Sequence, residues 1–166
     1  MKKILIYIAL VCFAITLLGG CDFSRGGPTE HTFLQGRTDV LKVEICTNSE
    51  IINWREGSMI DTLHPLAELS NEEIDSLWNA LLAFPSAEVN YIESGCGDLL
   101  FVFTYADGQK ELIGYGEIGV LNPDGTFSKY RSHVLADGKA LAKLFARYAD
   151  VKMLREASKS FNAYYQ

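Results

Sequence analysis

Several kinds of residue are scarce in this sequence of 166 residues, and each scarcity limits the chemistry available to it. The three histidines, His31, His64 and His133, stand far apart, and none has a partner at the close spacing of a zinc site. Lysine and arginine number 15 against 21 acidic residues. They form no basic run, so the chain lacks the charged face that binds nucleic-acid phosphates. We therefore expect no metal, no cofactor and no nucleic-acid partner.

Long apolar runs are also missing, apart from one near the start of the chain. Ile4 to Leu18 is a stretch of 15 uncharged, mostly apolar residues preceded by Lys2 and Lys3. A transmembrane helix needs about 20 such residues to cross the hydrocarbon core. A run of this shorter length behind a positive segment is typical of the apolar core of a signal peptide.

The apolar run ends in Leu18-Gly19-Gly20-Cys21. These residues resemble the lipobox of bacterial lipoproteins, with Gly19 at a position that is usually Ala, Ser or Thr. The resemblance covers only residues 1–21. It implies cleavage before the cysteine and attachment of a diacylglycerol to the Cys21 thiol. An uncleaved membrane anchor and an ordinary secreted protein are the alternatives.

This interpretation divides the chain into a signal peptide over 1–20, a lipidated Cys21 with a flexible tether over 21–37, and one globular domain over 38–166. A glycine-rich tether of about 16 residues spans roughly 20–25 Å. Removal of the signal peptide takes two lysines and leaves 13 basic against 21 acidic residues, a net charge of −8. We expect the domain to lie on the extracytoplasmic side, held to the membrane by its lipid.

Cysteine is also infrequent, with four in the chain. Cys12 leaves with the signal peptide and Cys21 carries the lipid, so Cys46 and Cys96 remain as one pair in an exported domain. A disulfide between them would close a loop of about 50 residues and contribute roughly 4 kcal/mol of stability. Two free thiols are the alternative.

The pattern of the remaining chain predicts strands joined by short turns. Val40 to Cys46 alternates, with Leu41, Val43 and Ile45 on one face. Leu99 to Tyr105 is apolar on both faces and should be a central strand. Further strands are predicted over 111–121 and 126–134, after turns containing Asp107-Gly108 and Pro123-Asp124-Gly125, and a short pair over 51–54 and 59–63. Short turns make these neighbours antiparallel.

Helix signals stand between and after these strands. Ser70 and Glu73 form a capping box before apolar residues at helical spacing, and Pro85 ends that helix. Asp137 is placed to cap a second helix, and Asp150 either caps a third or lies within a continuous one. The order predicts an α+β fold, with an antiparallel sheet of about four strands and two or three helices packed mainly on one face.

Residues with catalytic potential are few. Gly114 to Gly119 matches G-x-G-x-x-G but leads to a turn, whereas a nucleotide site needs a helix there, so we expect no nucleotide. Cys96 between two glycines could act as a nucleophile with His133 as its base. Among the acids, Glu73 and Asp75 have a capping or surface explanation, and Asp98 starts a strand. Four aromatic residues are candidates for a binding face: Trp54, Tyr130, Tyr164 and Tyr165.

The sequence therefore favours a membrane-anchored envelope lipoprotein whose domain is a non-catalytic binding or structural module, with a protein or envelope component as its partner. An acidic domain of this kind would also suit an inhibitor or immunity lipoprotein that blocks a basic enzyme. A small envelope hydrolase is the alternative from a different class.

Overall fold

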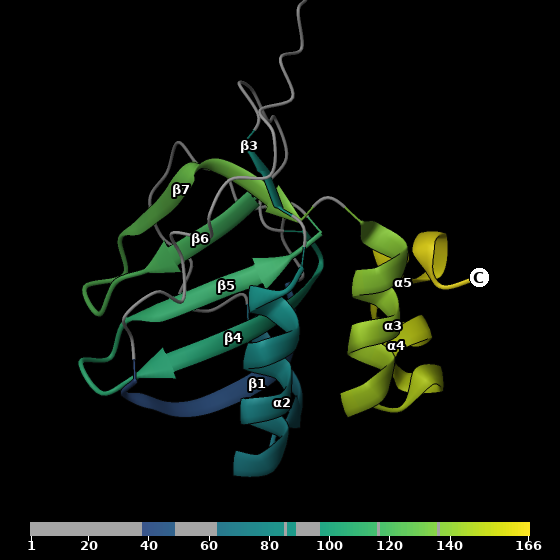
Figure 1. Cartoon of the computed structure of the whole chain (residues 1–166), viewed down its shortest axis with the longest axis horizontal. Helices are drawn as coiled ribbons and strands as arrows, with labels where there is room; N and C mark the ends of the chain where they lie inside the picture. Colours follow the sequence, from purple (N-terminus) through teal and green to yellow (C-terminus); the bar gives the residue numbers. More distant parts are fainter. Residues whose placement is uncertain (1–37, 49–62, 85, 89–96, 116, 136) are drawn as a thin grey trace, which may run out of the picture.

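The computed structural model describes residues 38–48, 63–84, 86–88, 97–115, 117–135 and 137–166. They contain one antiparallel sheet of seven strands in the order β2-β1-β4-β5-β6-β7-β3 (Figure 1). The strands are β1 (Val40–Asn48), β2 (Leu63–Glu68), β3 (Ser86–Glu88), β4 (Leu99–Tyr105), β5 (Lys110–Gly114), β6 (Glu117–Leu121) and β7 (Phe127–Leu135). The helices are α2 (Asn71–Leu82), α3 (Gly138–Tyr148), α4 (Val151–Ala157) and α5 (Lys159–Tyr164).

The predicted α+β class is confirmed, and the predicted packing on one face describes the main core. In Figure 1, α2 crosses in front of β1 and β4, while α3, α4 and α5 gather beside the strand ends. Residues of all four helices share one buried cluster with β1, β4, β5 and β6. Among the described residues, no helix combines the length and the apolar content needed to cross a bilayer.

The sheet is larger than predicted because one expected strand divides and two edge strands were missed. Residues 111–121 form β5 and β6, two antiparallel strands that pair Leu112 with Gly119. At one edge, β2 carries Pro65, which has no N–H to donate and is therefore tolerated in an edge strand. At the other edge lies β3 with three residues. The strand predicted over 51–54 and residues 59–62 of its predicted partner lie outside the described residues, and β2 begins at Leu63.

The start of β1 departs from the predicted alternation. Val40 pairs with Tyr105 and Lys42 with Thr104, so two steps along β1 match one step along β4. The extra residue is Leu41, and a bulge of this kind turns its side chain away from the core. Leu41 is accordingly 68% exposed, whereas Val40 packs against the core that Leu41 was expected to join.

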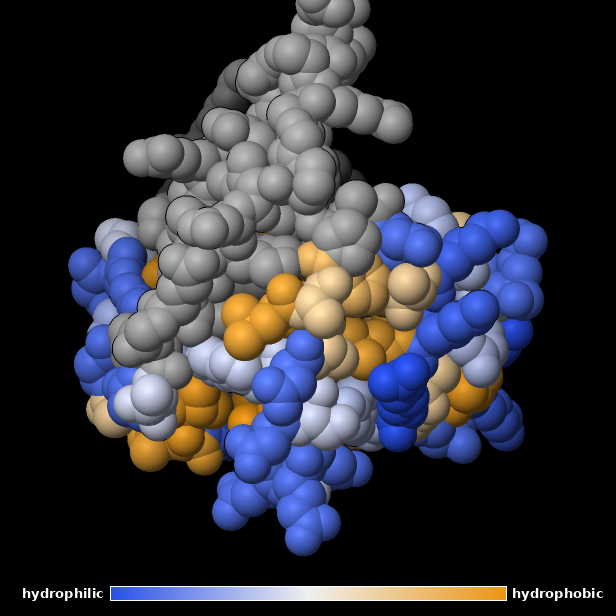
Figure 2. Space-filling model, in the orientation of Figure 1, coloured by the Kyte–Doolittle hydropathy of each residue, from blue (hydrophilic) through white to orange (hydrophobic). Residues whose placement is uncertain are grey.

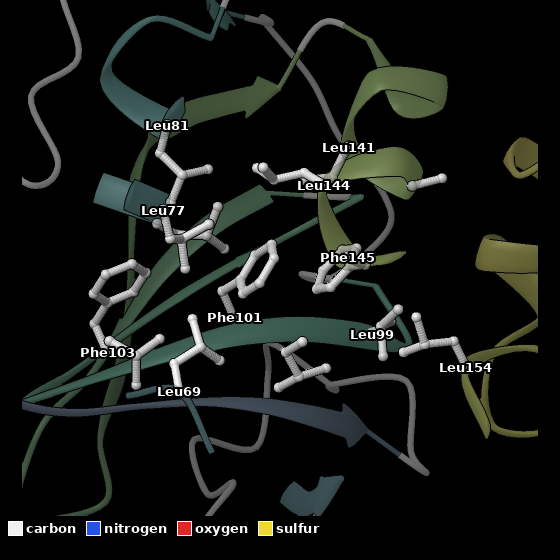
Figure 3. Close-up of a cluster of buried hydrophobic side chains, with 14 of the residues drawn as sticks. Leu69, Leu77, Leu81, Leu99, Phe101, Phe103, Leu141, Leu144, Phe145 and Leu154 are labelled. Atoms are coloured by element: carbon white, nitrogen blue, oxygen red, sulfur yellow. The ribbon is translucent and has the colours of Figure 1, made fainter. Parts of the chain in front are cut away.

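The core follows from the alternation of β4. Phe101 and Phe103 face the helices, while Leu100 and Val102 face a second apolar cluster on the opposite side of the sheet. Figure 3 shows Phe101 between Leu77 of α2 and Phe145 of α3. The Phe101 and Phe145 rings stack with centroids 4.1 Å apart and an interplanar angle of 7°. This contact joins the sheet to its C-terminal helices.

The helices begin where side-chain caps satisfy their first backbone amides. Ser70 caps α2: its Oγ accepts from the Glu73 N–H at 3.4 Å, and its own N–H donates to Glu73 Oε2 at 2.8 Å. Asp137 and Asp150 cap α3 and α4 as predicted. Ser158 caps α5, so the last two helices are separate.

Replacement of the α2 cap gives a first prediction. Ser70→Ala is expected to lower the free energy of unfolding by about 1 kcal/mol, because the first turn loses an acceptor for an orphan amide. Ser70→Thr should retain most of the stability. Chemical denaturation measures both. A Ser70→Ala variant as stable as the wild type would contradict the role of the cap.

The same cap sets a pH dependence. The hydrogen bond donated by the Ser70 N–H and, with a smaller effect, the one donated by the Ser70 hydroxyl lower the pKa of Glu73 below its ordinary value of 4.5. The folded state therefore favours the carboxylate, so this contribution to stability is present above about pH 4.5 and is lost as the pH falls through the lowered pKa. Ser70→Ala keeps the backbone N–H, so the carboxylate itself is replaced: the difference in free energy of unfolding between wild type and Glu73→Gln should narrow below pH 4.5 in denaturation curves.

A candidate binding hollow between α2 and the start of β1

A hollow of about 370 Å³ opens between α2 and the residues that lead into β1. Its lining residues are Thr38, Val40, Asn71, Ile74, Asp75 and Trp78. Ile74, Asp75 and Trp78 follow Asn71 by three, four and seven residues, which places all four on one stripe of α2. Because of the bulge at Leu41, Val40 lies on the face of the sheet that α2 covers. Local helix geometry and a pairing irregularity thus build the hollow together.

The lining combines apolar surface with one charged group. Trp78 is half-buried, and its ring meets that of Phe103 edge to face, with centroids 5.8 Å apart. Asp75 is exposed and makes no hydrogen bond or ion pair with another described residue. None of the described lining residues is basic. Figure 2 shows apolar residues on either side of the hydrophilic outer surface of α2. The hollow is suited to a ligand with a hydrocarbon part and a positive charge.

The cysteines are only partly described. Cys46 is a buried free thiol, and burial, with a smaller effect from the Glu44 carboxylate, raises its pKa to about 12. Such a thiol is protonated and unreactive at neutral pH. Strand β1 pairs antiparallel with β4, and Leu100 lies opposite Cys46. Cys46 forms no disulfide in this structure, and Cys96 lies outside the described residues, so the predicted Cys46–Cys96 bond is untested.

The histidine candidates do not meet within the described part of the chain. His64 is exposed on the edge strand β2. His133 lies on β7, where its backbone pairs with that of Glu88. His31 and Cys96 lie outside the described residues, so the proposed Cys96–His133 pair is untested. Across the described ranges, no group of three or more His, Cys, Asp or Glu residues is placed to hold a metal ion.

The glycine motif lies in a β-hairpin. Gly114 ends β5 and Gly119 lies within β6, the strand that returns antiparallel to it. Leu121 then leads through a tight turn at Gly125, where φ is +82°, into β7. A nucleotide site requires this motif to open a helix, whose N-terminus receives the phosphates. The hairpin provides no such helix.

Asp98 has a role that the sequence did not suggest. Its carboxylate accepts from Ser158 Oγ at 3.0 Å, from the Lys159 N–H at 2.7 Å and from the Ser160 N–H at 3.1 Å. These donors begin α5, about 60 residues further along the chain. The acid that precedes β4 therefore fixes the start of the last helix. No local pattern indicates this contact, because the two segments are far apart in the chain.

Two of the four candidate aromatic residues are described with their side chains. Tyr164 is 42% exposed, yet its ring stacks on Tyr115 with centroids 5.2 Å apart. It also lies over Gly138, where a Cβ atom would approach the ring to 2.8 Å, so a larger residue there would have to displace the Tyr164 ring. Tyr165 stacks on Phe161. Packing accounts for both, whereas Trp54 and the Tyr130 side chain lie outside what the structure describes.

Comparison of the chain with protein-family models, with curated proteins and with solved structures found no match. Function is therefore inferred from the hollow and from the sequence that precedes it.

Proposed function

We propose that this protein is a lipid-anchored envelope lipoprotein whose domain is a non-catalytic module that binds a protein partner at the membrane surface. The position of the hollow is the observation that carries the proposal. Thr38 and Val40, which line it, stand where the 21–37 tether joins the domain. With a lipid on Cys21, a flexible tether of this length would place the hollow at a root-mean-square distance of roughly 20–25 Å from the bilayer.

The composition of the hollow favours binding over catalysis. Among the described lining residues, Asp75 carries the one carboxylate, and none is a histidine or a cysteine. General acid–base chemistry uses groups within hydrogen-bond reach of one another or of the reacting atoms. An apolar wall with a single charge is instead typical of a recognition pocket.

The excess of acidic residues favours a basic partner. The mature chain carries a net charge of −8, which would speed association with a cationic protein at low salt. An inhibitor or immunity lipoprotein that blocks a basic enzyme is therefore the more specific form of this proposal. The alternative is a small envelope hydrolase that uses Cys96 and His133.

Affinity capture from a membrane extract tests the proposal. The mature chain with Cys21→Ser, immobilised through its C-terminus, should retain one basic protein at low salt and release it at high salt. If the captured protein is an enzyme, loss of its activity in the complex would identify an inhibitor. Turnover of an envelope substrate by the chain itself, abolished by Cys96→Ala or His133→Ala, would contradict the proposal.

A further inference from the structure

We infer that the hollow between α2 and β1 receives a single lysine or arginine side chain of the protein partner. The inference rests on the proposed function and goes beyond it, because it names the group recognised and the residues that recognise it. Asp75 would hold the cationic head, and Trp78 with Val40 and Ile74 would cover the methylene stem. These are the charged and apolar residues that line the hollow.

The hollow is large enough to admit one long side chain. Its volume of about 370 Å³ is at the lower end of the roughly 300–1,000 Å³ typical of small-molecule pockets. Lysine and arginine bury their methylene stems along apolar surface and keep the charged head near water. The apolar lining would contact the methylene stem, and the exposed carboxylate of Asp75 at the open rim would meet the charged head near water.

The charge at the rim is available to a ligand. Glu73 in the same helical turn is occupied by the Ser70 cap, whereas Asp75 has no partner among the described residues. The nearest competing cation on β1, Lys42, pairs with Glu44 at 2.8 Å and with Glu68 at 3.3 Å. Lys42 pairs with Thr104 of β4, and its side chain lies on the face of β1 opposite to that of Val43 and Ile45. Within the described ranges, no internal cation therefore forms an ion pair with Asp75.

The aromatic wall adds selectivity for a cation. A lysine or arginine head within about 6 Å of a tryptophan ring is attracted by the negative face of the ring, and more strongly when water is excluded. Trp78 is half-buried and is held by its contact with Phe103. Binding of a partner therefore costs little entropy for ordering the Trp78 ring. A carboxylate beside such a ring recognises charge and shape at once.

Titration with single amino-acid derivatives tests the inference. The mature chain with Cys21→Ser is titrated with N-acetyl-arginine amide, with N-acetyl-lysine amide and with the neutral isostere N-acetyl-citrulline amide, while amide and indole signals are followed by NMR. Either cation should shift the signals of Asn71, Asp75 and Trp78, with a dissociation constant on the order of 10 mM for one side chain. Citrulline should produce no saturable shift at these residues.

Two matched variants assign the effect to the hollow. Asp75→Asn should weaken binding about tenfold, because a charge-assisted contact becomes a neutral one. Glu72→Gln removes the same charge from the same helix outside the hollow and should change affinity less than about twofold. Equal losses in the two variants, citrulline binding like arginine, or no shift at Trp78 up to about 100 mM cation would overturn the inference.

Failure of this inference is distinguishable from failure of the proposed function. If the cations do not bind the hollow but membrane extract still yields a basic partner, the partner is recognised elsewhere and the proposed function stands. If Asp75→Asn abolishes both cation binding and capture of that partner while Glu72→Gln preserves both, the hollow is the recognition site.

Discussion

Phe101→Ala is expected to lower the free energy of unfolding by about 3–5 kcal/mol, the range typical of removing a buried phenylalanine. Phe101 has no solvent exposure, stacks on Phe145 at 4.1 Å and meets Tyr148 edge to face at 6.3 Å. Its removal leaves a cavity between the sheet and α3. Since domains of this size are stable by only about 5–15 kcal/mol, much of the total stability should be lost. Urea denaturation followed by circular dichroism measures the effect.

Leu41→Ala provides the control. Leu41 is also a large apolar residue on a strand, but the bulge leaves it 68% exposed, so its removal should change stability by less than about 0.5 kcal/mol. If Phe101→Ala cost no more than Leu41→Ala, the packing of α3 against the sheet described here would be wrong.

Asp98→Ala has the second largest expected effect, a loss of about 2–3 kcal/mol. The variant removes a carboxylate that three donors share, and hydrogen bonds to charged groups each contribute about 1.5–3 kcal/mol. Helix α5 has six residues, too few to be stable without tertiary contacts. Hydrogen exchange at the Lys159 and Ser160 amides should accelerate in parallel, since both donate to Asp98.

Two variants separate the Asp98 contact from an ordinary helix cap. Asp150→Ala removes an exposed cap whose carboxylate accepts from the Met153 N–H at 2.9 Å, and about 1 kcal/mol should be lost. Asp98→Asn keeps one acceptor oxygen and should fall between the two. An Asp98→Ala variant no less stable than Asp150→Ala would show that α5 does not depend on this long-range contact.

Features set by neighbouring residues were predicted from the sequence. The capping box of α2, the caps at Asp137 and Asp150, and the central strand β4 all depend on local hydrogen bonds or on an uninterrupted apolar run. The turn at Asp107-Gly108 is confirmed as well, with Gly108 at a φ of +82° that glycine adopts without strain.

Features set by distant partners were not predicted. The bulge at Leu41 exists only because β1 and β4 pair out of step, and a simple alternation cannot indicate where pairing slips. The contact of Asp98 with α5 crosses about 60 residues. The hollow brings together Val40 and Trp78, which are far apart in the sequence. One local signal was present: Asn71 and Asp75 interrupt the helical stripe that carries Ile74 and Trp78 with polar residues.

The most direct test of the account is the intact mass of the protein purified from its own membranes. We predict a chain that begins at Cys21, carries a diacylglycerol on the thiol and leaves the membrane only in detergent, whereas Cys21→Ser incorporates no labelled fatty acid. A chain with an unmodified N-terminus that washes off the membrane in buffer alone would contradict the lipid anchor, and with it the proposed site of action.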